Sequence, residues 1–148
     1  MNTSKESPLG TNKKTTGIQD RKAMLSTLWI FLTANYIYCD VLSHMEPAVI
    51  KELMTGTIGS IQVTQGFLLT AAIMMEIPFV MIVLSRALKY RTNRWVNIIA
   101  GAIMTAIQVG TMGMGTPPTL HYLFYSAIEI ACNLFIVWYA WKWHNPEG

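Results

Sequence analysis

The sequence predicts an all-α polytopic integral membrane protein: a bundle of four transmembrane helices with both termini cytoplasmic and a short amphipathic helix at the outer surface. Three observations predict this fold. Only 13% of the 148 residues are charged and 52% are hydrophobic, whereas charged residues make up about a quarter of a soluble domain. Four apolar runs are each long enough to cross hydrocarbon as a helix. Basic residues gather at the ends of these runs.

The composition excludes several classes of protein. Abundant apolar residues argue against disorder, and the two cysteines, Cys39 and Cys132, both lie inside apolar runs, so neither is expected to form a structural disulfide. The net charge of +3 invites a nucleic-acid partner, but that requires a basic face with groove-reading elements. We therefore expect membrane lipids as partners and no nucleic acid.

The elements follow in order along the chain. Residues 1–22 are expected to form a flexible basic cytoplasmic tail, because polar residues dominate and no apolar period is present. The transmembrane domain is expected at residues 23–143, with a C-terminal tail at 144–148. Its spans are expected at about residues 24–43, 61–84, 95–113 and 120–141.

The connections between spans also have recognisable patterns. Pro47 suits the first turn of a short helix at the outer surface, and the apolar residues that follow it share one side. Gly56 and Gly59 would let the chain turn back into the second span. The connection between the third and fourth spans is expected to be a tight turn at its Pro-Pro pair.

Lys and Arg set the orientation, because these residues are retained on the cytoplasmic side of short loops. Ten of the eleven basic residues precede the first span, separate the second from the third, or follow the fourth; the remaining one is Lys51. With four spans every segment obeys the rule. An odd number of spans would put one basic cluster on the wrong side.

Polar residues within the spans are the candidates for function, since an ionisable group in hydrocarbon is costly and usually faces a partner or a water-filled cavity. Glu76 and Glu129 are the principal candidates. At about 1.5 Å per residue, Glu76 lies about 15 Å from Arg86, and Glu129 about 20 Å from Lys142. The other residues expected to bind a ligand or couple to an ion are Asn35, Gln65, Gln108, Asn133 and Tyr125.

Two interpretations of the carboxyl groups stay open. They could bind a cation or a proton in a cavity, or remain protonated and hydrogen-bonded between helices, because burial disfavours the charged form of a carboxyl group. Pro78 is expected to bend the second span and free a carbonyl in the preceding turn, which favours a cavity there. The amide side chains are expected mainly to link helices.

A row of small residues along the third span, Ala102, Ala106 and Gly110, would let helices approach closely. We expect it to be a packing surface, either within the bundle or between subunits. A homo-oligomer is expected, because four helices alone enclose little cavity volume.

Metal and enzyme chemistry are disfavoured alternatives. Side chains that suit Cu(I) gather near the outer surface, at Cys39, His44, Met45, Met54, Met112, Met114 and His121. They have no compact ligand spacing, and the methionines are explained as packing or lipid-facing residues. We expect no metal and no cofactor. No nucleophile with a positioned base and no phosphate-binding motif is found, so no enzymatic activity is expected.

A family of small bacterial four-span membrane proteins of unknown function resembles this chain in three runs: LSTLWIFLTANYIYCDVLSHMEP (25–47), EIPFVMIVLSRALKYRTNRWVNIIAG (76–101) and GTPPTLHYLFYSAIEIACNLFIVWYAWKW (115–143). The resemblance implies an inner (plasma) membrane protein of a prokaryote and transfers no activity. Small multidrug transporters are similar in size and helix count. They have an essential membrane carboxylate in the first span, where this chain has Asn35.

The leading hypothesis is a small, oligomeric transport or channel protein. Its polar intramembrane cavity would pass a cation, a proton or a small solute, with Glu76 or Glu129 as the ionisable group. The alternative is a non-catalytic membrane scaffold or accessory subunit in which both carboxyl groups only link helices.

Overall fold

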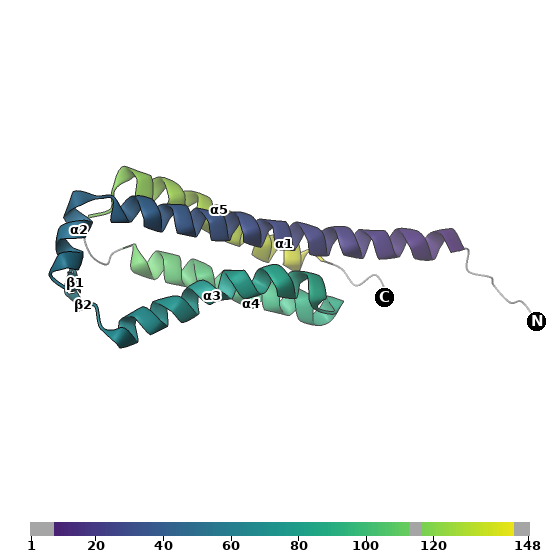
Figure 1. Cartoon of the computed structure of the whole chain (residues 1–148). Coiled ribbons are helices and arrows are strands. Elements are labelled where there is room, and N and C mark those ends of the chain that lie inside the picture. The colour runs from purple at the N-terminus through teal and green to yellow at the C-terminus, as the bar shows by residue number, and fades with distance from the viewer. Residues whose placement is uncertain (1–7, 113–116, 144–148) are drawn as a thin grey trace, which may run out of the picture.

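The four long helices of the protein lie side by side in an antiparallel arrangement (Figure 1). The computed structural model describes residues 8–112 and 117–143, of which residues 8–15 are described by their backbone alone. The elements in these ranges are α1 (Pro8–His44), α2 (Pro47–Met54), β1 (Thr57–Ile58), β2 (Ile61–Gln62), α3 (Gln65–Ala87), α4 (Tyr90–Thr111) and α5 (Leu120–Trp141). We call the end with α2 and the strands the hairpin end, and the opposite end, which holds the α3–α4 connection, the basic end.

Three of the described helices are long and apolar enough to cross a membrane: Thr16–His44 of α1, α3 and α5. They point to an integral membrane protein, and the predicted all-α class is confirmed. Helix α4 has the length of a span. Its first two turns hold two arginines and two buried asparagines, Asn93 and Asn97, which lower its hydropathy.

Helix α5 has the bounds predicted for the fourth span, whereas the start of the chain is corrected. Helix α1 begins at Pro8, so residues 8–22 are helical where the sequence predicts a tail without fixed structure. The helix continues beyond the apolar run because its part nearest the basic end still has contacts: Ile18 packs against the core, and the Arg21 guanidinium lies 5.2 Å from the centroid of the Tyr139 ring. Residues 1–7 and 144–148 lie outside the described residues.

Helices α3 and α4 begin at other residues than those predicted for the second and third spans. Helix α3 begins at Gln65 because Thr64 caps it, its hydroxyl accepting from the Phe67 amide at 3.2 Å. Residues 61–62 instead pair with 57–58 in the hairpin. Helix α4 begins at Tyr90, directly after the two-residue connection from α3. Helix α3 continues through Pro78 without interruption.

The amphipathic helix at the hairpin end is confirmed as α2, with Pro47 in its first turn. Gly56 and Gly59 have φ angles of 75° and 58°, a backbone region that glycine enters without steric cost. These two residues turn the chain through the hairpin into α3. The predicted Pro-Pro turn follows residues 113–116, which lie outside the described residues.

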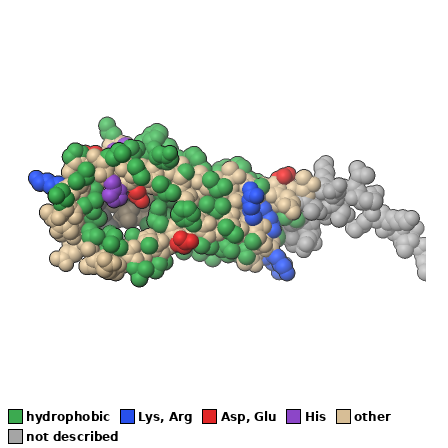
Figure 2. All heavy atoms as spheres, in the orientation of Figure 1, with side chains coloured by type: hydrophobic (Ala, Val, Ile, Leu, Met, Phe, Trp, Pro, Cys, Tyr) green, Lys and Arg blue, Asp and Glu red, His purple; other side chains and the backbone are tan. Residues whose placement is uncertain are grey.

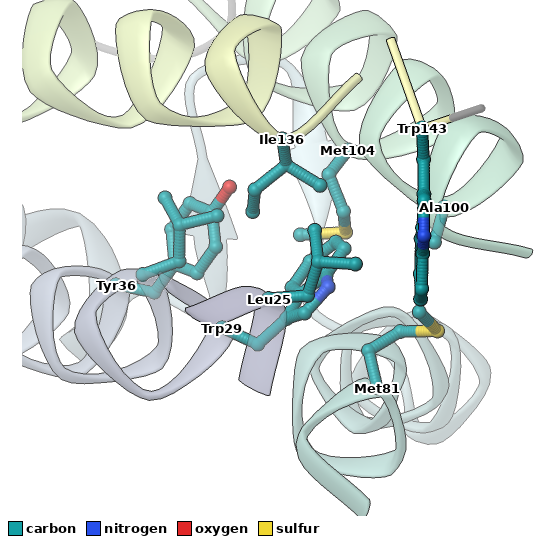
Figure 3. Close-up of a cluster of buried hydrophobic side chains, with 9 residues drawn as sticks. Leu25, Trp29, Tyr36, Met81, Ala100, Met104, Ile136 and Trp143 are labelled. Atoms are coloured by element: carbon teal, nitrogen blue, oxygen red, sulfur yellow. The ribbon is translucent and has the colours of Figure 1, made fainter. Parts of the chain in front are cut away.

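The core joins all four long helices (Figure 3). Helices α1 and α4 each pack on both α3 and α5. Gly101 lets α4 approach α5 closely, since a Cβ atom there would lie only 2.8 Å from Val137 Cγ2. The buried members of the core are Leu25, Trp29, Leu32, Tyr36, Met81, Ala100, Met104, Ile136 and Trp143.

A buried hydrogen-bond network around Asn97 joins α1, α3 and α4. Asn97 Oδ1 accepts from Trp29 Nε1 at 2.7 Å and from Ser85 Oγ at 3.2 Å. Asn97 Nδ2 donates to Asn93 Oδ1 at 2.6 Å, and Asn93 Nδ2 donates to the Ser85 carbonyl at 2.6 Å. The network therefore satisfies buried amides and also a carbonyl in the last turn of α3.

We expect Asn97→Leu to lower the free energy of unfolding by about 1–3 kcal/mol, because Trp29 Nε1 and Asn93 Oδ1 would lose their buried partner. Asn35→Leu is the matched control, since the Asn35 amide donates to Phe31 O of its own helix. Denaturant titration of both variants in mild detergent measures the difference. Equal losses would contradict a role for the network in joining helices.

Candidate functional site

Glu129 is the one carboxyl among the described residues that is fully buried, with 0% of its surface exposed. It belongs to a buried stripe on α5 whose members recur every three or four residues, as one face of a helix requires. The stripe is Ser126, Glu129, Asn133, Ile136 and Ala140. Because α5 packs on α1 and α4, this face directs Glu129 into the bundle.

Glu129 has no hydrogen-bond partner among the described residues at either carboxyl oxygen. One helical turn away, Asn133 Nδ2 donates to Tyr36 Oη at 2.8 Å, which leaves Asn133 Oδ1 without a partner as well. Tyr36, Cys39 and Asp40 of α1 lie within electrostatic reach of Glu129. Three acceptor atoms of the site, both Glu129 carboxyl oxygens and Asn133 Oδ1, thus have no donor assigned to them among the described residues.

The two sides of this site differ in chemistry. Toward the basic end it is closed by apolar side chains with 0% exposure: Leu25, Trp29, Leu32 and Ile136. Toward the hairpin end the neighbouring groups are polar. Gln108 Nε2 donates to Ser126 Oγ at 2.8 Å, and Ser43 lies nearer the end of α1. The carboxyl therefore lies between an apolar plug and a polar end of the bundle.

A cavity of about 180 Å³ opens at the hairpin end, lined by groups that include Ser43, Glu46, Glu52, His121 and Tyr122. The hydroxyl of Ser43 lies 3.5 Å from His121 Nε2, and Thr119 Oγ1 lies 3.0 Å from His121 Nδ1. Figure 2 shows the molecule hollowed beside a histidine side chain at this end. Polar side chains of α1 and α5 thus extend from this cavity toward Glu129.

Glu76 does not join this site. It is exposed on α3 and lines a groove between α3 and α4. Glu76 faces outward, whereas Glu129 faces into the bundle. The two principal candidates from the sequence are therefore separated, because the rotation of each helix about its axis turns one inward and the other outward.

The remaining predicted residues are placed as follows. Asn35 bonds within its own helix, Gln65 is exposed at the start of α3, and Gln108 links α4 to α5. The half-buried Tyr125 makes an edge contact with Phe124, with ring centroids 5.7 Å apart. Asn133 is the one amide of the predicted set that lies beside Glu129.

The predicted row of small residues does not pack within the bundle. Ala102, Ala106 and Gly110 are all exposed, and a Cβ atom on Gly110 would meet nothing within 4 Å. The close approach is made by Gly101, next to the row, because α4 is rotated so that Asn93, Asn97, Ala100, Gly101 and Met104 face inward. A role between subunits stays a prediction.

A soft-metal site is the disfavoured alternative near the hairpin end. Within residues 8–112 and 117–143, no three His, Cys, Asp or Glu side chains are grouped closely enough to hold a metal ion. Cys39 is buried on α1, whereas Met45 and Met54 are exposed. Met114 lies outside the described residues.

Tyr36 and Ser126 are members of the site that the sequence did not single out. Their spacing offers a signal, since Tyr36 lies three residues from Cys39, and Ser126 lies three residues before Glu129. The sequence instead offered Tyr125, four residues before Glu129, as the candidate on this part of the chain. The two choices differ by one residue, and only the packing of α5 against α1 and α4 distinguishes them.

The fold and the site define an α-helical membrane protein with an unpaired carboxyl group buried in its bundle. Residues 15–147 match the family of unknown function DUF6326, and the chain belongs to that family. No curated protein and no solved structure matches the chain. The family resemblance seen in the sequence is thereby confirmed.

We expect Glu129→Leu to leave the free energy of unfolding unchanged or to raise it by up to about 3 kcal/mol, because a buried polar group without a partner is costly to keep. Asn133→Leu should lower it by about 0.5–2 kcal/mol, since the hydrogen bond to Tyr36 is lost. Denaturant titration in detergent compares the two. A large loss of stability in Glu129→Leu would mean that this carboxyl holds the helices together.

Proposed function

We propose that this protein transports a proton or a small cation across the membrane and that Glu129 is the group that binds it. The observation that carries the proposal is the complete burial of Glu129 with both carboxyl oxygens unpartnered. Such a group destabilises the bundle, since ionisable residues in membrane segments are expensive and usually mark ion or proton pathways. A ligand that supplies the absent positive charge or hydrogen-bond donor offsets that cost.

The chemistry of the site favours a positively charged ligand. Both oxygens of Glu129 and the Oδ1 atom of Asn133 are acceptors without donors. Carboxylate and amide oxygens are ligands for hard cations, and they also accept from a proton or an ammonium group. An anion would meet no donor among these three atoms.

The burial of Glu129 favours a carrier over an open pore. A side chain with no exposed surface does not touch a water column through the bundle, so transport requires a change that exposes the site to each side in turn. The polar groups near the hairpin end, Ser43 and His121 with the cavity beside them, support entry from that end. The apolar side chains on the other side then form the closed gate.

The proposed topology has four spans, both termini in the cytoplasm and a location in the inner (plasma) membrane. Helix α4 packs along α5 and α3, which supports its crossing the membrane at the same depth as they do. The basic end holds Arg86, Lys89, Arg91 and Arg94, and Figure 2 shows basic side chains gathered toward that end. Lys and Arg retained on the cytoplasmic side support the orientation.

The test is flux into vesicles that contain the purified protein. A proton gradient, followed with an internal pH-sensitive dye, is compared with gradients of sodium and potassium. The parent should move at least one of these ions faster than protein-free vesicles. Glu129→Gln keeps the shape but removes the ionisable group, and we expect its flux to fall to the protein-free level.

Asp20→Asn is the control, because Asp20 is exposed near the start of α1 at the basic end, away from the buried site and from the cavity at the hairpin end. It should keep the parental flux. Unchanged transport by Glu129→Gln would overturn the assignment of that residue. A parent that moves none of the ions would overturn the proposed transport of protons and small cations.

The Asn97 network favours a second function, that of a membrane scaffold or accessory subunit. In this network the polar side chains join helices, and the amides of Asn93 and Asn97 are both paired. In a scaffold, Glu129→Gln would retain association with partner proteins and no flux would be measured for any variant. Binding of an ion that saturates in the parent and vanishes in Glu129→Gln would exclude this function.

A further inference from the structure

Glu76 is a second membrane carboxyl without a partner, and it is placed differently from Glu129. It is the central residue of α3, its side chain is exposed, and no hydrogen bond or ion pair reaches it among the described residues. It lines an open groove of about 440 Å³ between α3 and α4. The other lining residues are apolar: Ile73, Ile77, Val80, Met81, Val96, Ile99, Ala100 and Ile103.

This placement leaves a polar group facing hydrocarbon at the middle of a span. Lipid tails can fill an apolar groove, but they offer a carboxyl group neither a donor nor an acceptor. Charged or polar residues in spans normally face the bundle interior or a polar partner. The groove therefore lacks an occupant that brings a polar group to the depth of Glu76.

We propose that a second copy of this chain occupies the groove, so that α3 of each protomer lies against the α3–α4 groove of the other. All copies insert in the same orientation, so a twofold axis perpendicular to the membrane places identical residues at equal depth. Each Glu76 then meets the Glu76 of the second copy. Two carboxyl groups that share a proton form the hydrogen bond that lipid cannot provide.

The exposed surface of α3 agrees with this partner. Only 11% of its apolar stretch is buried, against 39% for that of α1 and 28% for that of α5, so α3 is the least covered of these three spans. Its half nearest the hairpin end diverges from the other helices (Figure 1). Large apolar side chains are exposed along the whole of α3, at Leu69, Ile73, Val80 and Val83.

The facing surface of α4 provides room for a helix. Ile99, Ile103, Ala106 and Gly110 recur at intervals of four, three and four residues, the spacing of a single helix face. All four are exposed. The small members lie toward the hairpin end, beyond the part of the groove that Ile99 and Ile103 line. Small residues at such positions let helices pack closely in membranes.

Disulfide crosslinking in native membranes tests the proposal. Ile73 and Val80 flank Glu76 by one turn on each side, so Ile73→Cys and Val80→Cys should give crosslinked dimers on mild oxidation. Leu134→Cys is the matched control, since Leu134 is 54% exposed on α5, away from the groove. The parent, with Cys39 and Cys132 alone, should give none. Dimers through Leu134→Cys in place of these positions would overturn the assigned face.

The association constant in lipid vesicles, measured by energy transfer between labelled copies, supplies a second test. Glu76→Leu should weaken association roughly three- to thirty-fold, the effect of one interhelical hydrogen bond in a membrane. Ala106→Leu should weaken it through bulk, whereas Ala131→Leu, at an exposed position of α5, should leave it unchanged. A parent that stays monomeric, with lipid alone in the groove, would overturn the proposal. This outcome is independent of ion flux, which rests on Glu129.

Discussion

The structure depends on one constraint: a polar group inside hydrocarbon must find its partner within the protein, because lipid offers none. The basic half of the bundle meets this constraint fully at Asn97. Its amide accepts from Trp29 of α1 and from Ser85 of α3, so one side chain of α4 holds three helices in register. Apolar packing between helices in a membrane has little directional preference, and such hydrogen bonds supply it.

Two carboxyl groups have no such partner among the described residues, and they differ in how far the chain encloses them. Glu129 is enclosed by its own chain with its oxygens unpaired, so its partner must be small enough to enter a packed bundle. Glu76 is exposed in a groove, so its partner can be as large as a helix. Burial thus distinguishes the proposed site for a proton or cation from the proposed surface for a second copy, although both residues are glutamates within long helices.

The two ends of the bundle differ in packing: the basic end is closely packed, and the hairpin end is more open. Toward the basic end, apolar side chains are fully buried and the amides of Asn93 and Asn97 are paired. Toward the hairpin end, α3 diverges from its neighbours (Figure 1), and polar residues line a cavity. Local opening is expected where buried apolar contacts are fewest. A change of access at Glu129 would therefore begin near α2 and the hairpin and leave the Asn97 network intact.

The sequence by itself determined the class of protein, the bounds of α5, the helix α2 and the identity of the two carboxyl groups, because composition and apolar runs report how much of each segment can leave water. It did not determine that Glu129 faces inward, that Glu76 faces outward, or that Gly101 rather than Ala102 meets α5. Periodicity identifies a stripe on a helix, but every stripe of a membrane helix finds an apolar surrounding, in lipid or in protein. Only the packing of the helices decided which stripe faced the bundle and which carboxyl group was left without a partner inside it.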